Sequence, residues 1–545
     1  MSTLSEWATR ARSQRPNLVP ASERPPLAES MAIGSTTSVL SFLLALHLVL
    51  YLHVIPSDAI SRVANAYYVL FSRQPHLGAI GFVWNPLPSL LELPFTLLHS
   101  AWPALVSDGL AANIVSAAFA GLGAFYMNRL MFRFNLERWL RITLTAIYAY
   151  NPLILFYGAN GMTDVMMVST FLAAWEGALA YYQEHHLGAL VAAAIWLSIA
   201  FLIRYEAVPF AALLALGLAF ALFQQRRPPL EIEGVLTILL TPVVYVSALW
   251  IYLNWLIMKN PLYFLTSVYG NAAQLGTGAY AYAGLQGVAE HPVAVLAYVL
   301  RFTLLFWPII PALVLLVPLS MFKRTRDARV ALLLLPVAAL PLLQAVMLYL
   351  GKSAGWDRFF LTYIPAGVLL VAFLISKVSG SWRGPVAAGA LVVLLTGDAG
   401  TLLAMSSPIL GHGDGPTMAA IVQDRPVSSG LSQDQAIARY IDRHPHLLVG
   451  LDTFTFWDVV LSARNPHQYV ITSDLNFQSI LHYPEGRISD LLVPKPTNGM
   501  QLDAVDQAYP GLWRHGESWA VLVKSFPGSQ GARLYRILPN APGRP

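Results

Sequence analysis

The chain has 545 residues, of which 56% are hydrophobic and only 12% are charged, and its mean hydropathy is +0.55. Soluble globular proteins carry about 25% charged residues, so this composition excludes a water-soluble fold for most of the chain. The formal net charge is +5, but most basic residues lie in short loops between apolar runs, which indicates membrane topology rather than a nucleic-acid-binding patch. The lack of cysteine excludes disulfides, thiolate metal sites and cysteine nucleophiles.

The first 36 residues are polar and contain four arginines, Arg10, Arg12, Arg15 and Arg24. This stretch is too long for the charged region of an ordinary signal peptide, and no small-residue cleavage site follows the first apolar run. We therefore predict that residues 1–36 form a cytoplasmic arm and that the first apolar run is an uncleaved signal anchor.

A helix that spans a bilayer needs about 20 apolar residues. The sequence predicts about eleven such helices, at 37–55, 109–131, 139–157, 163–183, 187–203, 206–224, 232–257, 292–320, 328–350, 359–377 and 385–404.

A further apolar region, 84–106, decides the topology. If this region lies in the membrane interface, the basic loops between the predicted spans fall on the cytoplasmic side, as the positive-inside rule requires. Its prolines, Pro86, Pro88, Pro94 and Pro103, also argue against one straight helix. We predict a polytopic α-helical membrane domain over 37–404 with an interfacial segment, a large first external loop over 56–108 and a second over 258–291.

After residue 404 the proportion of charged residues, proline and serine rises, and short apolar runs alternate with helical patterns. Five segments read as strands and four as helices, which predicts a small extracytoplasmic α/β domain over 405–545 with a partly parallel sheet. The strands are expected at 447–451, 469–472, 490–493, 520–524 and 532–538, and the helices at 433–443, 454–464, 475–483 and 501–513.

Ionisable residues beside apolar spans are costly and are functional candidates by default. Under the predicted topology a set of them lies at the outer face: Asp58, Asp164, Arg204, Glu206, Lys352, Asp357 and Arg358, with His76 in the first loop. Simpler interpretations remain for several of them. Lys352 and Asp357 are also typical interface anchors, Arg204 can pair with Glu206, and a lone histidine is more often structural. Arg301, within a span, can pair with Asp398, and Glu176 can make a structural hydrogen bond.

Five short motifs occur in order at this face. They are Ser57-Asp58-Ala59, Gln74-Pro75-His76-Leu77 leading to Trp84-Asn85-Pro86-Leu87-Pro88, Asn160-Gly161-Met162-Thr163-Asp164, Arg204-Tyr205-Glu206-Ala207, and Trp356-Asp357-Arg358-Phe359-Phe360. With these motifs the chain resembles the GT-C class of integral-membrane glycosyltransferases, which includes protein O-mannosyltransferases and aminoarabinose transferases. Several members carry paired acids in the first loop, whereas Ala59 follows Asp58 here, so a divalent metal ion stays an open question and no metal ligand is predicted.

The resemblance implies transfer of a sugar from a polyprenyl-phosphate donor to an acceptor hydroxyl of a glycan, lipid or protein, with inversion at the anomeric carbon. Asp58 is the expected base and Asp164 its catalytic partner. Arg204, Arg358 and Lys352 are expected to bind the donor phosphate, supported by Glu206, His76 and Asp357. No nucleic-acid partner and no certain cofactor are expected.

The implied location is the plasma (inner) membrane, with the N-terminus in the cytoplasm and the C-terminal domain in the periplasm or outside the cell. Two other functions remain open from the sequence. A lipid-linked saccharide flippase or transporter needs a polar path to the cytoplasmic side, and a non-catalytic scaffold would use the helices only to anchor the C-terminal domain in the cell envelope.

Overall fold

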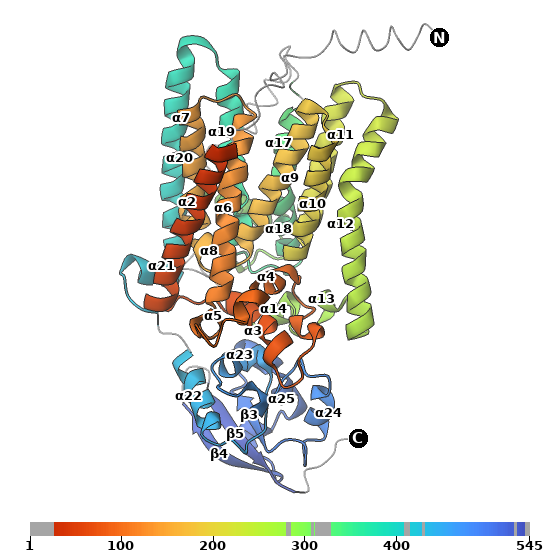
Figure 1. Cartoon of the computed structure of the whole chain (residues 1–545), viewed down its shortest axis with the longest axis vertical. Coiled ribbons are helices and arrows are strands. Elements are labelled where there is room, and N and C mark those ends of the chain that lie inside the picture. Colours follow the sequence, from red (N-terminus) through yellow and green to blue (C-terminus); the bar gives the residue numbers. More distant parts are fainter. Residues whose placement is uncertain are drawn as a thin grey trace.

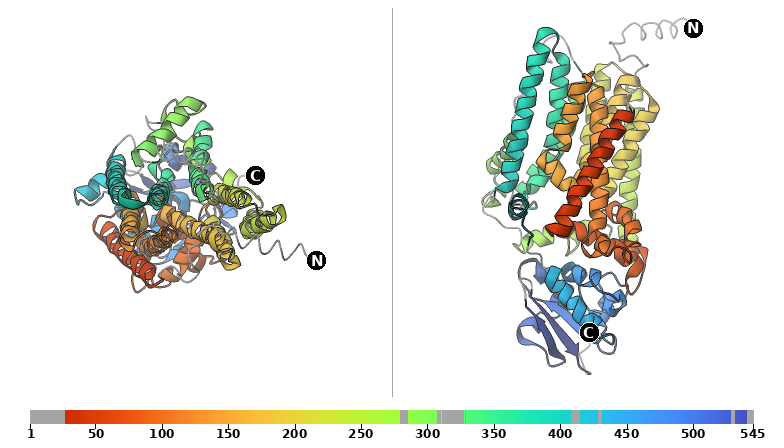
Figure 2. Two further views of the ribbon diagram at one scale, coloured as in Figure 1. Left: turned by 90° about the horizontal axis from the view of Figure 1, so that it is seen from above. Right: turned by 60° about the vertical axis from the view of Figure 1, so that its left-hand side comes forward.

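The computed structural model describes residues 27–278, 285–306, 310, 327, 329–407, 415–427, 431–527 and 531–539. A bundle of long helices stands on a layer of short helices, and a smaller C-terminal domain lies against the other side of that layer (Figure 1). Figure 2 shows the same three-tier arrangement from a second side. The predicted arm up to residue 26 and much of the predicted span 292–320 lie outside the described residues.

Seven helices of the described chain are long and apolar enough to cross a membrane. They are α2 with its π-helical end η1 (Leu27–Tyr51), α6 (Leu110–Phe132), α11 (Ala207–Gln224), α12 (Pro229–Met258), α17 with α18 (Arg329–Tyr349), η4 with α19 (Asp357–Lys377) and η5 with α20 (Gly380–Ser406). The pair α7 (Arg138–Ala149) and α8 (Pro152–Ala159), bent by 61°, passes the same test as one unit and gives up to eight spans.

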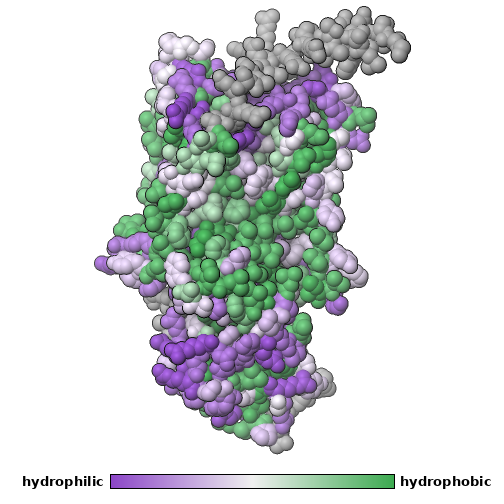
Figure 3. Space-filling view, viewed as in Figure 1, coloured by the Kyte–Doolittle hydropathy of each residue, from purple (hydrophilic) through white to green (hydrophobic). Residues whose placement is uncertain are grey.

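Three more helices of the described residues belong to the bundle: α9 (Asp164–Glu184), α10 (Leu187–Ile203) and α15 (Pro292–Phe306). Hydrophobic side chains cover the middle of the bundle, and hydrophilic residues gather at its far end and over the C-terminal domain (Figure 3). The chain is therefore a largely helical membrane protein, as its composition predicts, while the number of eleven spans stays a prediction.

The first helix begins earlier than expected. α2 starts at Leu27, so residues 27–36 belong to a helix and not to a polar arm. Its small polar residues face α6, where Gly34 and Gly121 bring the two backbones together. A Cβ on Gly121 would lie 2.3 Å from the Gly34 carbonyl oxygen. Small residues of this kind let membrane helices approach closely.

At the far end of the bundle, buried carboxylates pair with arginines. Glu176 on α9 accepts from Arg133 at 2.8 Å and from Arg129 at 3.2 Å. Glu29 on α2 accepts from Arg141 at 2.6 Å. These ion pairs support the structural interpretation of Glu176, because both its partners, Arg129 and Arg133, lie at the C-terminal end of α6 and join that helix to α9.

The region 84–106 contains two short helices, α4 (Leu87–Thr96) and α5 (Ala104–Ser107), and no single long one. Together with α3 (Ser57–Phe71) and η2 (Leu77–Ile80) they form the layer between the bundle and the C-terminal domain (Figure 1). The first loop is thus a folded platform on which the C-terminal domain rests.

The C-terminal domain has a five-stranded sheet in the order β2-β1-β3-β5-β4. β1 (Val449–Gly450) is parallel to β2 (Tyr469–Val470) and to β3 (Asp490–Pro494), whereas β5 (Ala532–Ile537) is antiparallel to β3 and to β4 (Ala520–Phe526). All five predicted strands are present and the sheet is partly parallel, as predicted. Helices α22 (Leu431–Asp442), α23 (Thr453–Leu461) and α24 (Phe477–His482) also match their predicted positions.

The helix predicted over 501–513 is wrong as one element. This stretch contains the end of η7 (Asn498–Leu502), then α25 (Ala504–Ala508) and the start of α26 (Leu512–His515). Asp503 explains the first break, because its side chain accepts hydrogen bonds from the backbone N–H groups of Val505 and Asp506 and so starts a new helix.

Several hydrogen bonds join the C-terminal domain to the first loop and to the end of α2. His76 Nε2 lies 2.9 Å from the Ser473 carbonyl oxygen, and the Leu475 N–H donates to the Gln74 side chain at 2.9 Å. The Val427 N–H donates to the Leu52 carbonyl at 2.8 Å. Buried side chains of α3 and of the C-terminal domain belong to one continuous hydrophobic core, so the domain is packed on the platform rather than tethered to it.

The C-terminal domain is expected to lose stability as pH rises from about 4 to about 7. Burial raises the pKa of Asp434 and of Asp506 to about 7, whereas an unfolded aspartate titrates near about 3.9. Across this window the unfolded chain releases protons that the folded chain keeps, so unfolding becomes easier as pH rises. Thermal unfolding of the full chain between pH 5 and 8 measures this slope.

Asp434→Asn is expected to flatten that slope, whereas the surface variant Glu485→Gln should leave it as in wild type. An unchanged slope in Asp434→Asn would show that Asp434 does not titrate in this window.

Candidate active site

Asp58 lies in the first turn of α3, where the platform meets the bundle. Pro56 takes an extended conformation before the helix (φ −63°, ψ 132°), and the helix N-terminus favours a carboxylate at this place. Asp58 Oδ2 accepts a hydrogen bond from Arg358 Nη2 at 3.2 Å. The Asp58 side chain remains 34% exposed, so a ligand can reach it.

Arg62, one turn further along α3, binds the backbone of Asp58 and was missed in the sequence. Its Nη1 donates to the Asp58 carbonyl oxygen at 2.6 Å, and its guanidinium lies over the Trp84 ring at 5.1 Å. Glu92 on α4 faces Arg62, and burial raises the pKa of Glu92 well above its ordinary value despite that nearby charge. The four-residue spacing of Asp58 and Arg62 on an amphipathic helix was the available signal.

Asp164 begins α9 directly after a tight loop. Gly161 in this loop has φ +81°, and a Cβ there would approach the Ala112 and Ala59 side chains to 3.0 and 3.1 Å. The loop therefore needs glycine and lies directly against α3 and α6. Asp164 is only 1% exposed, and its Oδ1 accepts from Arg204 Nη1 at 3.1 Å.

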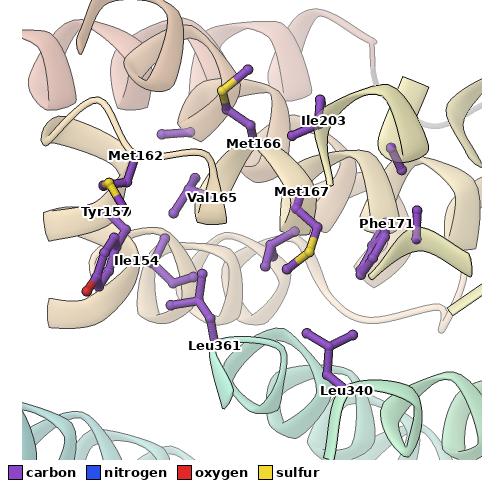
Figure 4. Close-up of a cluster of buried hydrophobic side chains, with 14 of the residues drawn as sticks. Ile154, Tyr157, Met162, Val165, Met166, Met167, Phe171, Ile203, Leu340 and Leu361 are labelled. Atoms are coloured by element: carbon purple, nitrogen blue, oxygen red, sulfur yellow. The ribbon is translucent and has the colours of Figure 1, made fainter. Parts of the chain in front are cut away.

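An apolar cluster fixes the same loop from inside the bundle. Met162 points into a group of buried side chains that includes Tyr157 of α8 and Leu361, directly after η4 (Figure 4). Because Leu361 follows the turn that carries Arg358, the Asn160–Asp164 loop and that turn share one packing unit.

Arg204 follows α10 and holds two carboxylates at once. Its Nε and Nη2 donate to Glu206 Oε1 at 3.0 and 2.5 Å, and its Nη1 donates to Asp164. Burial raises the pKa of Glu206, but the adjacent Arg204 outweighs this and holds it below its ordinary value. The predicted pairing of Arg204 with Glu206 is present, and all three guanidinium nitrogens are engaged.

Arg358 has more donor capacity left than Arg204. It sits on η4 (Asp357–Phe360) over the Trp356 ring at 4.1 Å, and its backbone N–H is accepted by the Asp357 side chain at 2.7 Å. Its Nε is buried without a hydrogen-bond partner among the described residues, and Nη1 reaches only the Met162 sulfur at 3.8 Å. Arg358 can therefore hold Asp58 and still donate to an anion.

Lys352 and His76 lie apart from these two ion pairs. Lys352 is exposed after α18, and within the described residues no hydrogen bond or ion pair joins its side chain to Asp58 or Asp164. His76 contacts the C-terminal domain through Ser473. The geometry thus gathers Asp58, Asp164, Arg204, Glu206, Asp357 and Arg358, and adds Arg62.

Two acids of this site are paired with arginines. The described part of the chain has no group of three or more His, Asp or Glu side chains placed to hold a metal ion. Arg358 is bound to Asp58 and Arg204 to Asp164, and both cations would repel a divalent ion at those oxygens.

Comparison with known proteins gives little beyond this geometry. Neither a protein-family model nor a curated protein matches the chain. A similar solved structure is the archaeal oligosaccharyltransferase AglB from Archaeoglobus fulgidus in complex with an inhibitory peptide and a dolichol-phosphate, with a TM-score of 0.47 and 12% identity over 93% of this chain and 75% of that chain. At this TM-score and identity the likeness assigns no activity to this chain.

Proposed function

We propose that this protein is a membrane glycosyltransferase that moves a sugar from a polyprenyl-phosphate donor to an acceptor hydroxyl. The observation that carries the proposal is the ion pair between Asp58 and Arg358, which joins the first loop to a turn 300 residues later in the chain. It sets a partly exposed carboxylate at the start of α3 beside a guanidinium that has unused donors.

These two groups suit the two charge changes of glycosyl transfer. Cleavage of the bond between the sugar and the phosphate develops negative charge on the leaving group, and the free donors of Arg358 would stabilise it. The attacking hydroxyl loses its proton as it bonds to the anomeric carbon, and Asp58 would accept that proton. The products are the glycosylated acceptor and the polyprenyl phosphate.

A single displacement of this kind inverts the anomeric carbon. Asp164 is 1% exposed and its Oδ1 accepts from Arg204, whereas the Asp58 side chain is 34% exposed. We therefore assign Asp58 as the base and no carboxylate as a nucleophile for a covalent intermediate. We propose that Asp164, Arg204 and Glu206 position the loops, and that the active face is the outer one, with the C-terminal domain outside the cell or in the periplasm.

The test is donor binding by the purified protein in detergent, with a panel of polyprenyl-phosphate sugars. We expect one sugar class to bind and to be released slowly as free sugar or transferred to an acceptor. Arg358→Ala should weaken binding of that donor at least about tenfold, as loss of a charge-assisted hydrogen bond predicts.

Arg383→Ala is the matched control, because Arg383 lies at the far end of the bundle and donates only to the Asn135 carbonyl. Transport of a labelled lipid-linked saccharide in vesicles without any glycosidic product would contradict the proposal and favour a flippase. Folded protein that binds no donor in a broad panel would favour a scaffold.

A further inference from the structure

Arg301 is a guanidinium inside the bundle for which the described chain supplies no carboxylate. It lies on α15, and its Nε and Nη2 are buried without a hydrogen-bond partner among the described residues. Asp398 on α20, the partner suggested by the sequence, instead accepts from Asn151 at 2.6 Å. The predicted pairing of Arg301 with Asp398 is therefore wrong.

The lack of a carboxylate partner distinguishes Arg301 from other arginines of the bundle. Described arginines that form ion pairs with carboxylates include Arg129, Arg133, Arg141, Arg204 and Arg358. The parts of 279–328 outside the described ranges contain no aspartate or glutamate. A cation in an apolar bundle is costly unless an anion accompanies it.

The surroundings place Arg301 beside the turn that carries Arg358. Its guanidinium lies over the Tyr298 ring at 4.7 Å and the Phe302 ring at 5.5 Å. Tyr298 Oη donates to the Gly355 carbonyl at 2.6 Å, and Phe302 stacks on Phe360 with ring centres 4.6 Å apart. Gly355 and Phe360 bracket Arg358, so both arginines belong to the same small region.

The chemistry of the unused donors indicates which anion fits. Nε and Nη2 form one edge of the guanidinium, and their parallel N–H groups match two oxygens of one phosphate or carboxylate. Exposed apolar residues of the same helix, Val293, Leu296, Leu300 and Leu304, give it a surface suited to lipid. An anion that reaches Arg301 from this surface is therefore carried by a lipid, and the common lipid anion of this geometry is a phosphate ester.

We infer that Arg301 binds the phosphate of a membrane lipid at a subsite next to Arg358. The inference rests on the proposed function in taking that lipid to be the polyprenyl-phosphate donor. The Nε and Nη2 atoms of Arg301 are buried by neighbouring residues. Binding of a phosphate therefore requires the half-buried side chain to rotate toward the lipid-facing surface.

The test is lipid binding measured by native mass spectrometry on the full chain in detergent. The probes are a polyprenyl phosphate, the unphosphorylated polyprenol, and phosphatidylglycerol as a bulk phospholipid. Arg301→Gln is expected to weaken binding of polyprenyl phosphate at least about tenfold and to leave polyprenol binding unchanged. Arg301→Lys keeps the charge without the two-pronged edge and should bind with intermediate affinity, and Arg383→Gln should bind as wild type does.

A second readout separates binding from a structural role. If Arg301 serves a ligand, Arg301→Leu in lipid-free detergent should have the same Tm as wild type or a higher one, because an uncompensated cation has been replaced by an apolar side chain. A clear fall in the Tm of Arg301→Leu would overturn the inference, because it would show that the charge of Arg301 stabilises the fold without a ligand.

The outcomes for the two proposals differ. Wild-type binding of polyprenyl phosphate that is unaffected by Arg301→Gln overturns the subsite and leaves the proposed function standing. Arg301-dependent binding of phosphatidylglycerol alone supports a lipid-phosphate site and contradicts the proposed donor. Absence of binding of both phosphate lipids to folded wild type overturns both.

Discussion

Asp58→Asn is expected to slow sugar transfer by a factor on the order of 10² to 10⁴, the usual contribution of a positioned general base. The amide keeps the size of the side chain and an oxygen that can accept from Arg358, so a neutral hydrogen bond can replace the ion pair. What the variant loses is the ability to take the proton of the acceptor. Donor binding and Tm should therefore stay close to wild type while turnover falls.

Asp108→Asn is the matched control for this experiment, because Asp108 is another acid of the first loop and bonds only locally, to Ser107. Turnover near the wild-type rate in Asp58→Asn would remove Asp58 from the proposed mechanism. A loss of donor binding as large as the loss of turnover would instead assign Asp58 the task of orienting Arg358.

Arg204→Ala is expected to destabilise the protein by about 3–5 kcal/mol, the range found when one partner of a buried ion pair is removed. Arg204 is the shared partner of Asp164, which is 1% exposed, and of Glu206. Without the guanidinium, two nearby carboxylates face each other in a site that water hardly reaches. A large fall in Tm of the detergent-solubilised protein is the expected measurement.

A neutral version of the same site provides the comparison. The triple variant Asp164→Asn, Arg204→Gln, Glu206→Gln keeps the hydrogen-bonding groups and removes all three charges, so it should recover much of the Tm lost in Arg204→Ala. If Arg204→Ala unfolds at the wild-type temperature, the three residues do not hold the loops in place, and their role would have to lie in binding a ligand.

Local sequence patterns predicted much of this fold, because strands and helix ends depend mainly on residues that are close together in the chain. The five strands of the C-terminal domain follow from short apolar runs between turn residues, and the prolines of 84–106 predicted that no long helix forms there. The start of the first helix was predicted at residue 37 instead of Leu27, because the first 36 residues were interpreted as one polar arm. In the bundle Ser30 is fully buried and hydrogen-bonded to Asn128.

The candidate site was predictable as a set of residues but not as a set of pairs. Asp58, Asp164, Arg204 and Arg358 stand out because charges beside apolar runs are costly, and Arg204 with Glu206 is close in sequence. The contact of Asp58 with Arg358 spans 300 residues, and a single sequence has no local signal for it. Arg62 was missed because its charge lies within an amphipathic stretch that also suits a solvated face.

The long sequence separation between contacting residues also determines when their contacts can form during synthesis. The partner of Asp58 is synthesised 300 residues later, and Leu475, the partner of Gln74, is synthesised 401 residues later. At about 5–20 residues per second, Asp58 waits on the order of 15–60 s after its own synthesis. The nascent chain therefore carries Asp58 without Arg358, and a platform without the C-terminal domain, until translation is nearly finished. Premature termination before Arg358 would leave Asp58 without its cation, so under the proposed function we expect such a truncated chain to be inactive.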